Sequence, residues 1–292
     1  MTLGRPTLGL NLPYVEGSMD GRTPRWADVR AMATTAEAMG FDAVWISDHV
    51  GFGDPGGEWS GAWESWTLLS ALAAATSRVR LGTYVTAIPY RNPALLAKMA
   101  ETLDEVSGGR VILGLGAGWN EPEFRAYGFP WERRFDRFED GLRVITSMLR
   151  TGRADHAGRL ASAHGARLEP RGPRPGGLPV MVGAAGPRML RLAAELADEW
   201  NAGMRSPEEL APMLAAVDAA CAAAGRDPRT LIRSAETLVD TGAGFSVAEV
   251  LGRLDRYAAL GTSHVQVQLR PNSIDGVRAF APVMEALRRP TG

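Results

Sequence analysis

The stretch Gly40–His49, GFDAVWISDH, decides how the chain is interpreted. Gly40 can end a helix, and Ala43–Ile46 is a short apolar run typical of a buried parallel strand. A Ser-Asp-His sequence follows directly. In a barrel of alternating strands and helices, active sites lie at the carboxyl ends of the strands. A histidine there, beside a carboxylate, can exchange a proton near neutral pH, so His49, with Asp48 beside it, is a candidate catalytic residue. The alternative is a histidine that only caps a loop.

Length and composition fit one sizeable globular unit. The chain has 292 residues, 45% of them hydrophobic and 22% charged, which suits a single α/β barrel. The formal net charge of −1 gives no bulk attraction to nucleic acid or to an anionic membrane. The single cysteine, Cys221, cannot form an internal disulfide, so a cytoplasmic location is expected.

No targeting or membrane segment is expected. Residues 1–13 contain one early basic residue and then a strand-like run, which does not resemble a signal peptide. The longest apolar run, around Leu68–Ala75, is too short to cross a bilayer.

Strand-like and helix-like segments alternate along the whole chain. The best-marked helix is Pro93–Val106, with Asn92 as its cap. It has a predicted apolar stripe of Leu95, Met99, Leu103 and Val106. Residues 151–178, rich in Gly, Pro and Arg, break the alternation and are predicted to be an inserted excursion carrying a hairpin. About eight strand–helix units remain, which predicts an α/β fold of the (β/α)8 TIM-barrel type, with residues 1–292 as one domain. The alternative, a doubly wound sheet, would show a glycine fingerprint after an early strand, and none follows Leu12 or Ile46.

The predicted strand ends carry amides, glycines and aromatic residues, and one histidine. They hold no His, Cys and carboxylate cluster at metal-ligand spacing, so no metal site is predicted. The turn Gly114–Asn120 lets the backbone approach a flat group closely, although a plain tight turn explains it as well. Gly183–Gly186 precedes a helix that starts with proline, which favours an anion site there, with Arg188 as a possible supplement. Trp59, Trp63 and Trp66 could wall an apolar pocket, or be divided between core and lid.

Five segments together resemble the luciferase-like monooxygenase superfamily, and most closely its branch that uses the deazaflavin coenzyme F420. They are GFDAVWISDHV (40–50), WTLLSALAAATSRVRLGTYVTAIPYRNPALLAK (66–98), LDEVSGGRVILGLGAGWNEPEF (103–124), RFDRFEDGLRVI (134–145) and VGAAGPRMLRLAAELADEWN (182–201). The resemblance covers most of the chain in the right order and is looser in the excursion and the last third.

The resemblance implies a usually dimeric (β/α)8 barrel with the cofactor ring at the strand ends. His49 would face the ring and the substrate, with Asp48 orienting it or tuning its pKa. A non-prolyl cis peptide at Tyr84-Val85, or one bond to either side, would support the ring. The residues implied to bind the cofactor are Tyr84, Val85, Ala87, Gly118, Asn120, Gly183, Ala184, Ala185 and Gly186, of which Gly183–Gly186 would hold its phosphate. Asn11, Trp63 and Trp119 are expected to line the substrate pocket.

Two departures narrow the expected activity. Members that oxidise sugar phosphates carry a glutamate just after the glycine-rich turn, where this chain has Trp119. Luciferases carry a reactive cysteine after a mid-barrel strand, and Cys221 lies elsewhere.

Three functions remain open. The first is an F420-dependent oxidoreductase that transfers a hydride between deazaflavin C5 and a small organic substrate. The second is a monooxygenase that uses O2 and reduced flavin mononucleotide (FMN) supplied by a separate reductase. The third is a non-catalytic flavin-binding barrel.

Overall fold

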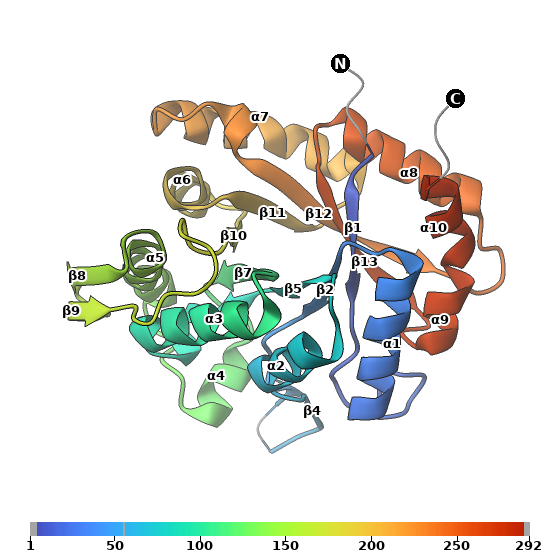
Figure 1. The fold of residues 1–292 in the computed structure, drawn as a ribbon, viewed down its shortest axis with the longest axis horizontal. Coiled ribbons are helices and arrows are strands. Elements are labelled where there is room, and N and C mark those ends of the chain that lie inside the picture. Colours follow the sequence, from blue (N-terminus) through green and yellow to red (C-terminus); the bar gives the residue numbers. More distant parts are fainter. Residues whose placement is uncertain (1–4, 55, 289–292) are drawn as a thin grey trace.

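A closed barrel of eight parallel strands forms the centre of the molecule (Figure 1). The computed structural model describes residues 5–54 and 56–288. The strands are paired in the order β10-β11-β12-β13-β1-β2-β5-β7, and pairing of β10 with β7 closes the ring. They are β1 (Thr7–Asn11), β2 (Ala43–Ile46), β5 (Arg80–Thr83), β7 (Val111–Gly116), β10 (Val180–Gly183), β11 (Glu199–Met204), β12 (Ile232–Asp240) and β13 (His264–Arg270). The predicted barrel is therefore confirmed.

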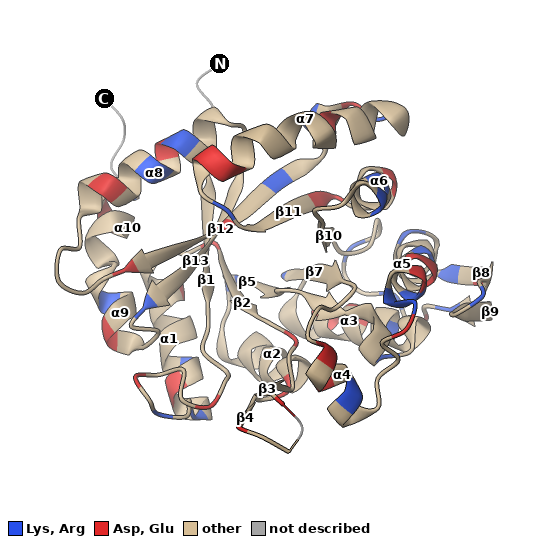
Figure 2. Cartoon of the chain, turned by 180° about the vertical axis from the view of Figure 1, so that it is seen from behind, with Lys and Arg blue, Asp and Glu red and all other residues tan. Residues whose placement is uncertain are grey.

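Helices surround this barrel, and charged residues recur along many of them, as Figure 2 shows. They are α1 (Trp26–Met39), α2 (Ser65–Ala75), α3 (Pro93–Ser107), α4 (Glu121–Tyr127), α5 (Arg134–Thr151), α6 (Pro187–Leu196), α7 (Pro207–Ala223), α8 (Val247–Ala259), α9 (Ile274–Ala279) and α10 (Ala281–Arg288). Short 3-10 turns occur at Ile88–Tyr90 and Pro228–Thr230. Within residues 5–54 and 56–288, no helix is long and apolar enough to cross a membrane.

Three smaller strand pairings lie outside the ring. The excursion contains the expected hairpin, formed by β8 (Arg153–Ala157) and β9 (Ser162–Arg167), which projects beside α5 in Figure 1. A second hairpin of β3 (Gly51–Gly53) and β4 (Trp59–Gly61) follows β2, and the sequence did not predict it. The short β6 (Thr86–Ala87) pairs with β7 after the Tyr84-Val85 peptide bond, which is cis.

Helix α3 packs differently from the prediction. Asn92 caps it as expected, by accepting a hydrogen bond from the Leu95 amide at 3.1 Å. However, Leu95 and Val106 are each 56% exposed, so the predicted apolar stripe is wrong. The core-facing side of the helix is instead formed by Leu96, Ala97, Ala100 and Leu103. Leu95 and Val106 line an open groove between α2 and α3.

The barrel interior is built around Trp45 of β2. Its indole packs with Ala43, Ile112 and Met181 in a buried cluster separate from the larger core under the helices. Glycines on the two neighbouring strands make room for the ring. A Cβ at Gly82 would lie 2.0 Å from Trp45 Cε3, and one at Gly9 would lie 2.1 Å from Trp45 Nε1.

We therefore expect Gly82→Ala to lower the free energy of unfolding by about 1–3 kcal/mol, because the added methyl overpacks a rigid ring. Urea denaturation measures this. Gly176→Ala is the matched control, since a Cβ there meets nothing within 4 Å, and its effect should stay within about 0.5 kcal/mol. Equal stability of the two variants would contradict this account of the barrel interior.

Candidate active site

Two cavities meet at the carboxyl ends of the barrel strands. The larger has a volume of about 610 Å³ and the smaller about 380 Å³. Three side chains line both of them, those of His49, Tyr84 and Trp119. We call them the large cavity and the small cavity. Their junction brings the predicted histidine to the place where two bound molecules could meet.

Glu123 holds the imidazole of His49. The two residues are 74 positions apart in the chain, and His49 Nδ1 lies 2.8 Å from Glu123 Oε2. A carboxylate can only accept, so Nδ1 carries the proton and donates it. His49 Nε2 is then the nitrogen that can exchange a proton with a ligand.

Glu123 is buried at the start of helix α4, and its side chain accepts several hydrogen bonds. Its side chain accepts from the backbone amides of Val50 and Gly51 and from the Asn120 amide. Burial opposes its charge, but the hydrogen bonds from His49, Val50 and Tyr90 outweigh burial and hold the pKa of Glu123 below its ordinary value. The carboxylate is therefore ionised and anchors the loop that carries His49.

The prediction that Asp48 orients His49 is wrong. The Asp48 carboxylate is buried and accepts from Arg91 at 2.6 and 2.9 Å, and from the Ser65 hydroxyl at 2.6 Å. Arg91 also contacts Glu64 at 2.8 Å. Burial opposes the charge of Arg91, yet the two carboxylates raise the pKa of its guanidinium. This ion pair joins the end of β2 to the start of α2 and to the segment before α3.

The large cavity is lined by two glycine-containing turns. Gly116–Trp119 forms one side and Gly183–Gly186 the other, with Tyr84, Val85 and Ala87 between them. Helix α6 begins at Pro187 after Gly186, where a Cβ would meet nothing within 4 Å. The backbone amides of such a helix start attract anions. The turn therefore has both the space and the donors for a phosphate.

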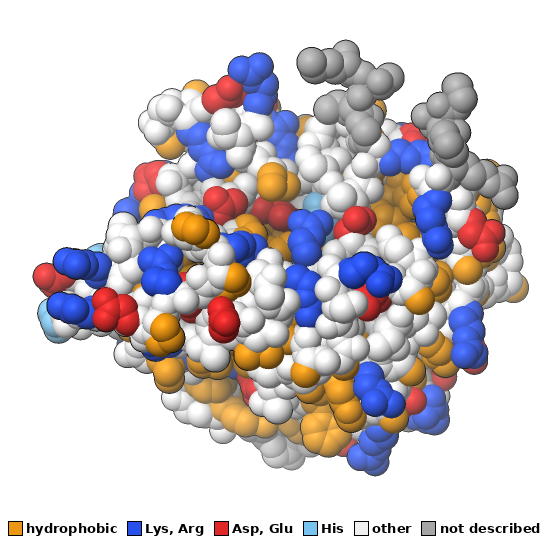
Figure 3. Space-filling view, viewed as in Figure 1, with side chains coloured by type: hydrophobic (Ala, Val, Ile, Leu, Met, Phe, Trp, Pro, Cys, Tyr) orange, Lys and Arg blue, Asp and Glu red, His pale blue; other side chains and the backbone are white. Residues whose placement is uncertain are grey.

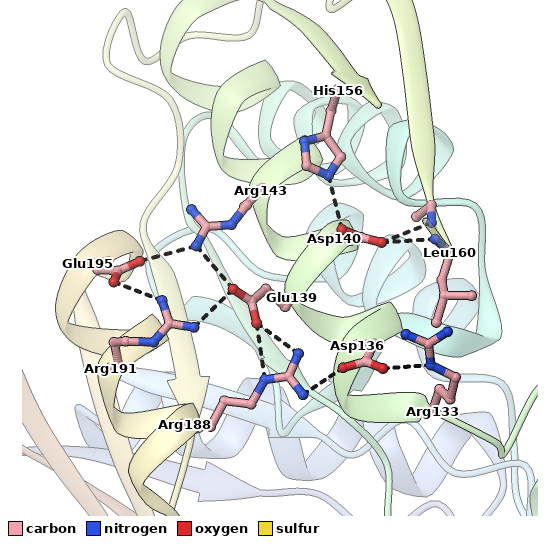
Figure 4. A network of polar contacts seen from close by, with 11 residues as sticks. Arg133, Asp136, Glu139, Asp140, Arg143, His156, Leu160, Arg188, Arg191 and Glu195 are labelled. Atoms are coloured by element: carbon pink, nitrogen blue, oxygen red, sulfur yellow. Dashed lines mark hydrogen bonds and ion pairs between the residues drawn. The ribbon is translucent and has the colours of Figure 1, made fainter. Parts of the chain in front are cut away.

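Arg188 does not supplement this turn. Figure 4 shows its guanidinium engaged by the carboxylates of α5, with Asp136 at 2.6 Å and Glu139 at 2.8 Å. Glu139 also pairs with Arg191 and Arg143. This network links α5 to α6. The arginines that line the large cavity are Arg134 and Arg205, which sequence reasoning missed.

Two further predicted residues lie outside the cavities. Asn120 is buried, and its amide donates to the Gly51 carbonyl at 3.1 Å and to Glu123, so it braces the loop. Trp63 is 44% exposed, and its indole donates to the Pro24 carbonyl at 2.7 Å. Neither side chain lines a cavity among the described residues. Asn11 and Trp119 line the small cavity.

The small cavity contains an unpredicted carboxyl group, Glu236 of β12. Its Oε1 lies 2.5 Å from Asn11 Nδ2. Burial raises the pKa of Glu236 from 4.5 to about 7, although Asn11 and Tyr84 oppose the shift. The sequence feature that could have identified Glu236 is a glutamate inside a strand whose neighbouring residues are buried. In the part of the chain that the structure describes, no cluster of His, Cys, Asp and Glu could hold a metal.

The structure is a TIM barrel with two adjoining cavities at the carboxyl ends of its strands, where enzymes of this fold have their active sites. The family model for luciferase-like monooxygenases matches residues 7–263, and the chain belongs to this family.

Two curated relatives illustrate the range. A 5,10-methylenetetrahydromethanopterin reductase of Archaeoglobus fulgidus is 34% identical over 191 residues, which are 65% of this chain and 53% of the relative. The pyrimidine monooxygenase RutA of Cronobacter sakazakii is 33% identical over 209 residues, 68% of this chain and 60% of the relative. The chain thus spans little more than half the length of either, but its membership of a family of oxidoreductases and monooxygenases is clear.

A solved structure confirms the fold. An F420-dependent secondary alcohol dehydrogenase, in complex with an F420-acetone adduct, superposes with a TM-score of 0.82 and 20% sequence identity. The match covers 98% of this chain and 100% of the other.

The raised pKa of Glu236 predicts how stability depends on pH. Between about pH 4.5 and about pH 7 the folded state holds this proton while the unfolded state has released it. The wild type therefore loses stability over that range, and Glu236→Gln, which cannot ionise, does not. By about pH 8 the variant should be more stable by up to about 3 kcal/mol, with no advantage below about pH 4.5. Urea denaturation across this range measures the difference, and a wild type that gains on the variant as pH rises would contradict it.

Proposed function

We propose that the chain is an F420-dependent oxidoreductase that acts on a small organic substrate. A bound deazaflavin supplies hydride transfer at its C5, and the protein supplies orientation and proton transfer. The observation that carries the proposal is the position of His49, where the large and small cavities meet, with Nδ1 held by Glu123. In this proposal, His49 Nε2 gives a proton to the substrate or removes one from it.

The large cavity suits the cofactor. Its volume of about 610 Å³ lies within the range of cofactor sites. Tyr84, Val85, Ala87 and Gly118 would support the ring. Gly183, Ala184, Ala185 and Gly186 would hold the phosphate at the start of α6. Arg134 and Arg205 add positive charge to the same cavity, which favours an anionic cofactor.

The small cavity would hold the substrate. Asn11 and Trp119 line it, together with Phe52, whose ring centroid lies 4.6 Å from that of His49. Trp119 packs edge-on to His49 with 5.3 Å between centroids. These two aromatic rings would limit the access of water to the proton-transferring nitrogen. Asp48 would act only indirectly, by fixing the end of β2.

The alternative function is an FMN-dependent monooxygenase that uses O2 and reduced flavin from a separate reductase. The similarity to RutA, a monooxygenase, supports this alternative function. A non-catalytic flavin-binding barrel is the third possibility, and the arrangement of His49 with Glu123 argues against it.

We also propose a homodimer, located in the cytoplasm, in which residues 1–292 form one domain with 151–178 as an insertion. The groove between α2 and α3 supports the proposal of a homodimer, because the exposed Leu95 and Val106 could be buried there against a second copy of the chain. Apolar side chains gather in the lower part of Figure 3, where α2, α4 and the hairpin of β4 lie in Figure 1. Light scattering of the purified chain would give the mass of a monomer if the proposal is wrong.

Titration of the protein with F420 and with FMN, followed by intrinsic tryptophan fluorescence, tests the choice of cofactor. Trp119 lines the large cavity, so occupancy should quench its emission. We expect saturable binding of F420 and binding of FMN at least tenfold weaker, a difference of about 1.4 kcal/mol.

A matched pair of variants tests the phosphate site. Gly186→Glu places a negative charge at the start of α6 and should abolish F420 binding. Gly176→Glu makes the same change where, as at Gly186, a Cβ has open space, and should bind F420 normally. In the titration of the wild type described above, tight binding of FMN alone would overturn the choice of F420.

A further inference from the structure

The lining of the small cavity combines a group of amide and carboxyl side chains with aromatic rings. The amide and carboxyl side chains are those of Asn11, Glu236, Gln268 and Asn272, and they come from β1, β12, β13 and the turn after β13. The aromatic rings of Tyr14, Trp45, Phe52 and Trp119 line the same cavity. A substrate held here would place its apolar part among rings and its polar part against amides and a carboxyl group.

Two side-chain acceptors in the lining of the small cavity have no hydrogen-bond partner. Asn11 uses its Nδ2 to donate to Glu236, which leaves its Oδ1 directed elsewhere. Asn11 Oδ1 and Asn272 Oδ1 are both buried without a hydrogen-bond partner in the described structure, and so is one donor of the same lining, Trp45 Nε1. Buried acceptors without partners are costly, so a ligand that donates to them gains the most.

The charge of the cavity points in the same direction. Among the described residues that line it there is no Lys or Arg, and Glu236 is the only carboxyl group. An anionic substrate would meet a carboxylate and unpartnered carbonyl oxygens. A protonated amine or a ring N–H would meet three acceptors.

We propose that the small cavity selects substrates that carry a hydrogen-bond-donating nitrogen, an amine or an N–H heterocycle, and that Glu236 determines this specificity. The inference rests on the proposed function only in calling this ligand the substrate. Glu236 and Asn11 bind the nitrogen, Asn272 accepts a further hydrogen bond, and the aromatic wall holds the apolar part against His49.

The ionisation of Glu236 adds a pH dependence. Burial raises its pKa to about 7, so the carboxylate that attracts a cation is formed at and above neutral pH. The other titratable groups around it are Tyr14 after β1 and Tyr84 after β5, whose pKa values burial raises, and His49 in the same cavity. The buried pair of Glu199 on β11 and His264 on β13 lies outside the cavity lining. Of the carboxyl groups among these, only Glu236 reaches the ligand.

Benzylamine, benzyl alcohol and benzoate are matched probes, since they share a ring and differ in the polar group. Their binding is measured by calorimetry and tryptophan fluorescence in the wild type, Glu236→Gln and Glu199→Gln. Glu199→Gln is the control, because it removes a buried barrel carboxyl group that does not line the cavity. We expect the wild type to bind benzylamine at least tenfold more tightly than benzyl alcohol or benzoate. The preference should vanish in Glu236→Gln and persist in Glu199→Gln.

The wild type alone gives a second measurement that does not depend on any variant folding. Benzylamine affinity should rise several-fold between about pH 5.5 and about pH 8, while benzyl alcohol affinity stays constant. Benzoate binding as tightly as benzylamine, or a preference that survives in Glu236→Gln, would overturn the inference. F420 binding in the same samples tests the proposed function separately: binding of F420 without the amine preference overturns only this inference. Amine preference without F420 binding supports the inference and overturns the proposed function.

Discussion

The hydrogen bond from His49 Nδ1 to Glu123 is the interaction on which the site depends. A buried carboxylate must have donors around it, and Glu123 obtains them from the loop after β2. The hydrogen bonds that stabilise the charge of Glu123 also fix the backbone of Val50 and Gly51 and the imidazole of His49. The same contacts that stabilise helix α4 against the β3–β4 hairpin therefore also set the tautomer of His49.

A second buried charge holds the other side of the same strand end. The Asp48 carboxylate pairs with Arg91, which also binds Glu64, the cap of helix α2. Successive side chains in extended chain point in opposite directions, so these neighbours in sequence serve different tasks. His49 lines both cavities, whereas Asp48 lines the large cavity and also ties β2 to the surrounding helices through Arg91.

Local pattern was enough to predict the barrel, the strand that ends before His49, the glycine turn at 183–186 and the hairpin in the excursion. It failed where partners are distant in sequence. Glu123 is 74 residues from His49, and nothing between them predicts that they meet. The predicted pairing of Asp48 with His49 rested only on their being neighbours in sequence. Arg188 was predicted to bind an anion, but it forms ion pairs with carboxylates of helix α5. Glu236 could have been predicted as a site residue from the sequence, because a glutamate inside a barrel strand is unusual.

The role of Glu123 as the group that fixes the proton on His49 Nδ1 is the central claim, and nitrogen-15 NMR of the histidine rings tests it directly. The chain has 4 histidines, so the His49 signals can be assigned by its substitution. The account predicts that, at neutral pH, His49 shows a hydrogen-bonded Nδ1 proton protected from exchange in the wild type, and that this signal is lost in Glu123→Ala, which has no side-chain acceptor. A neutral ring protonated at Nε2, or an Nδ1 proton unaffected by Glu123→Ala, would contradict it.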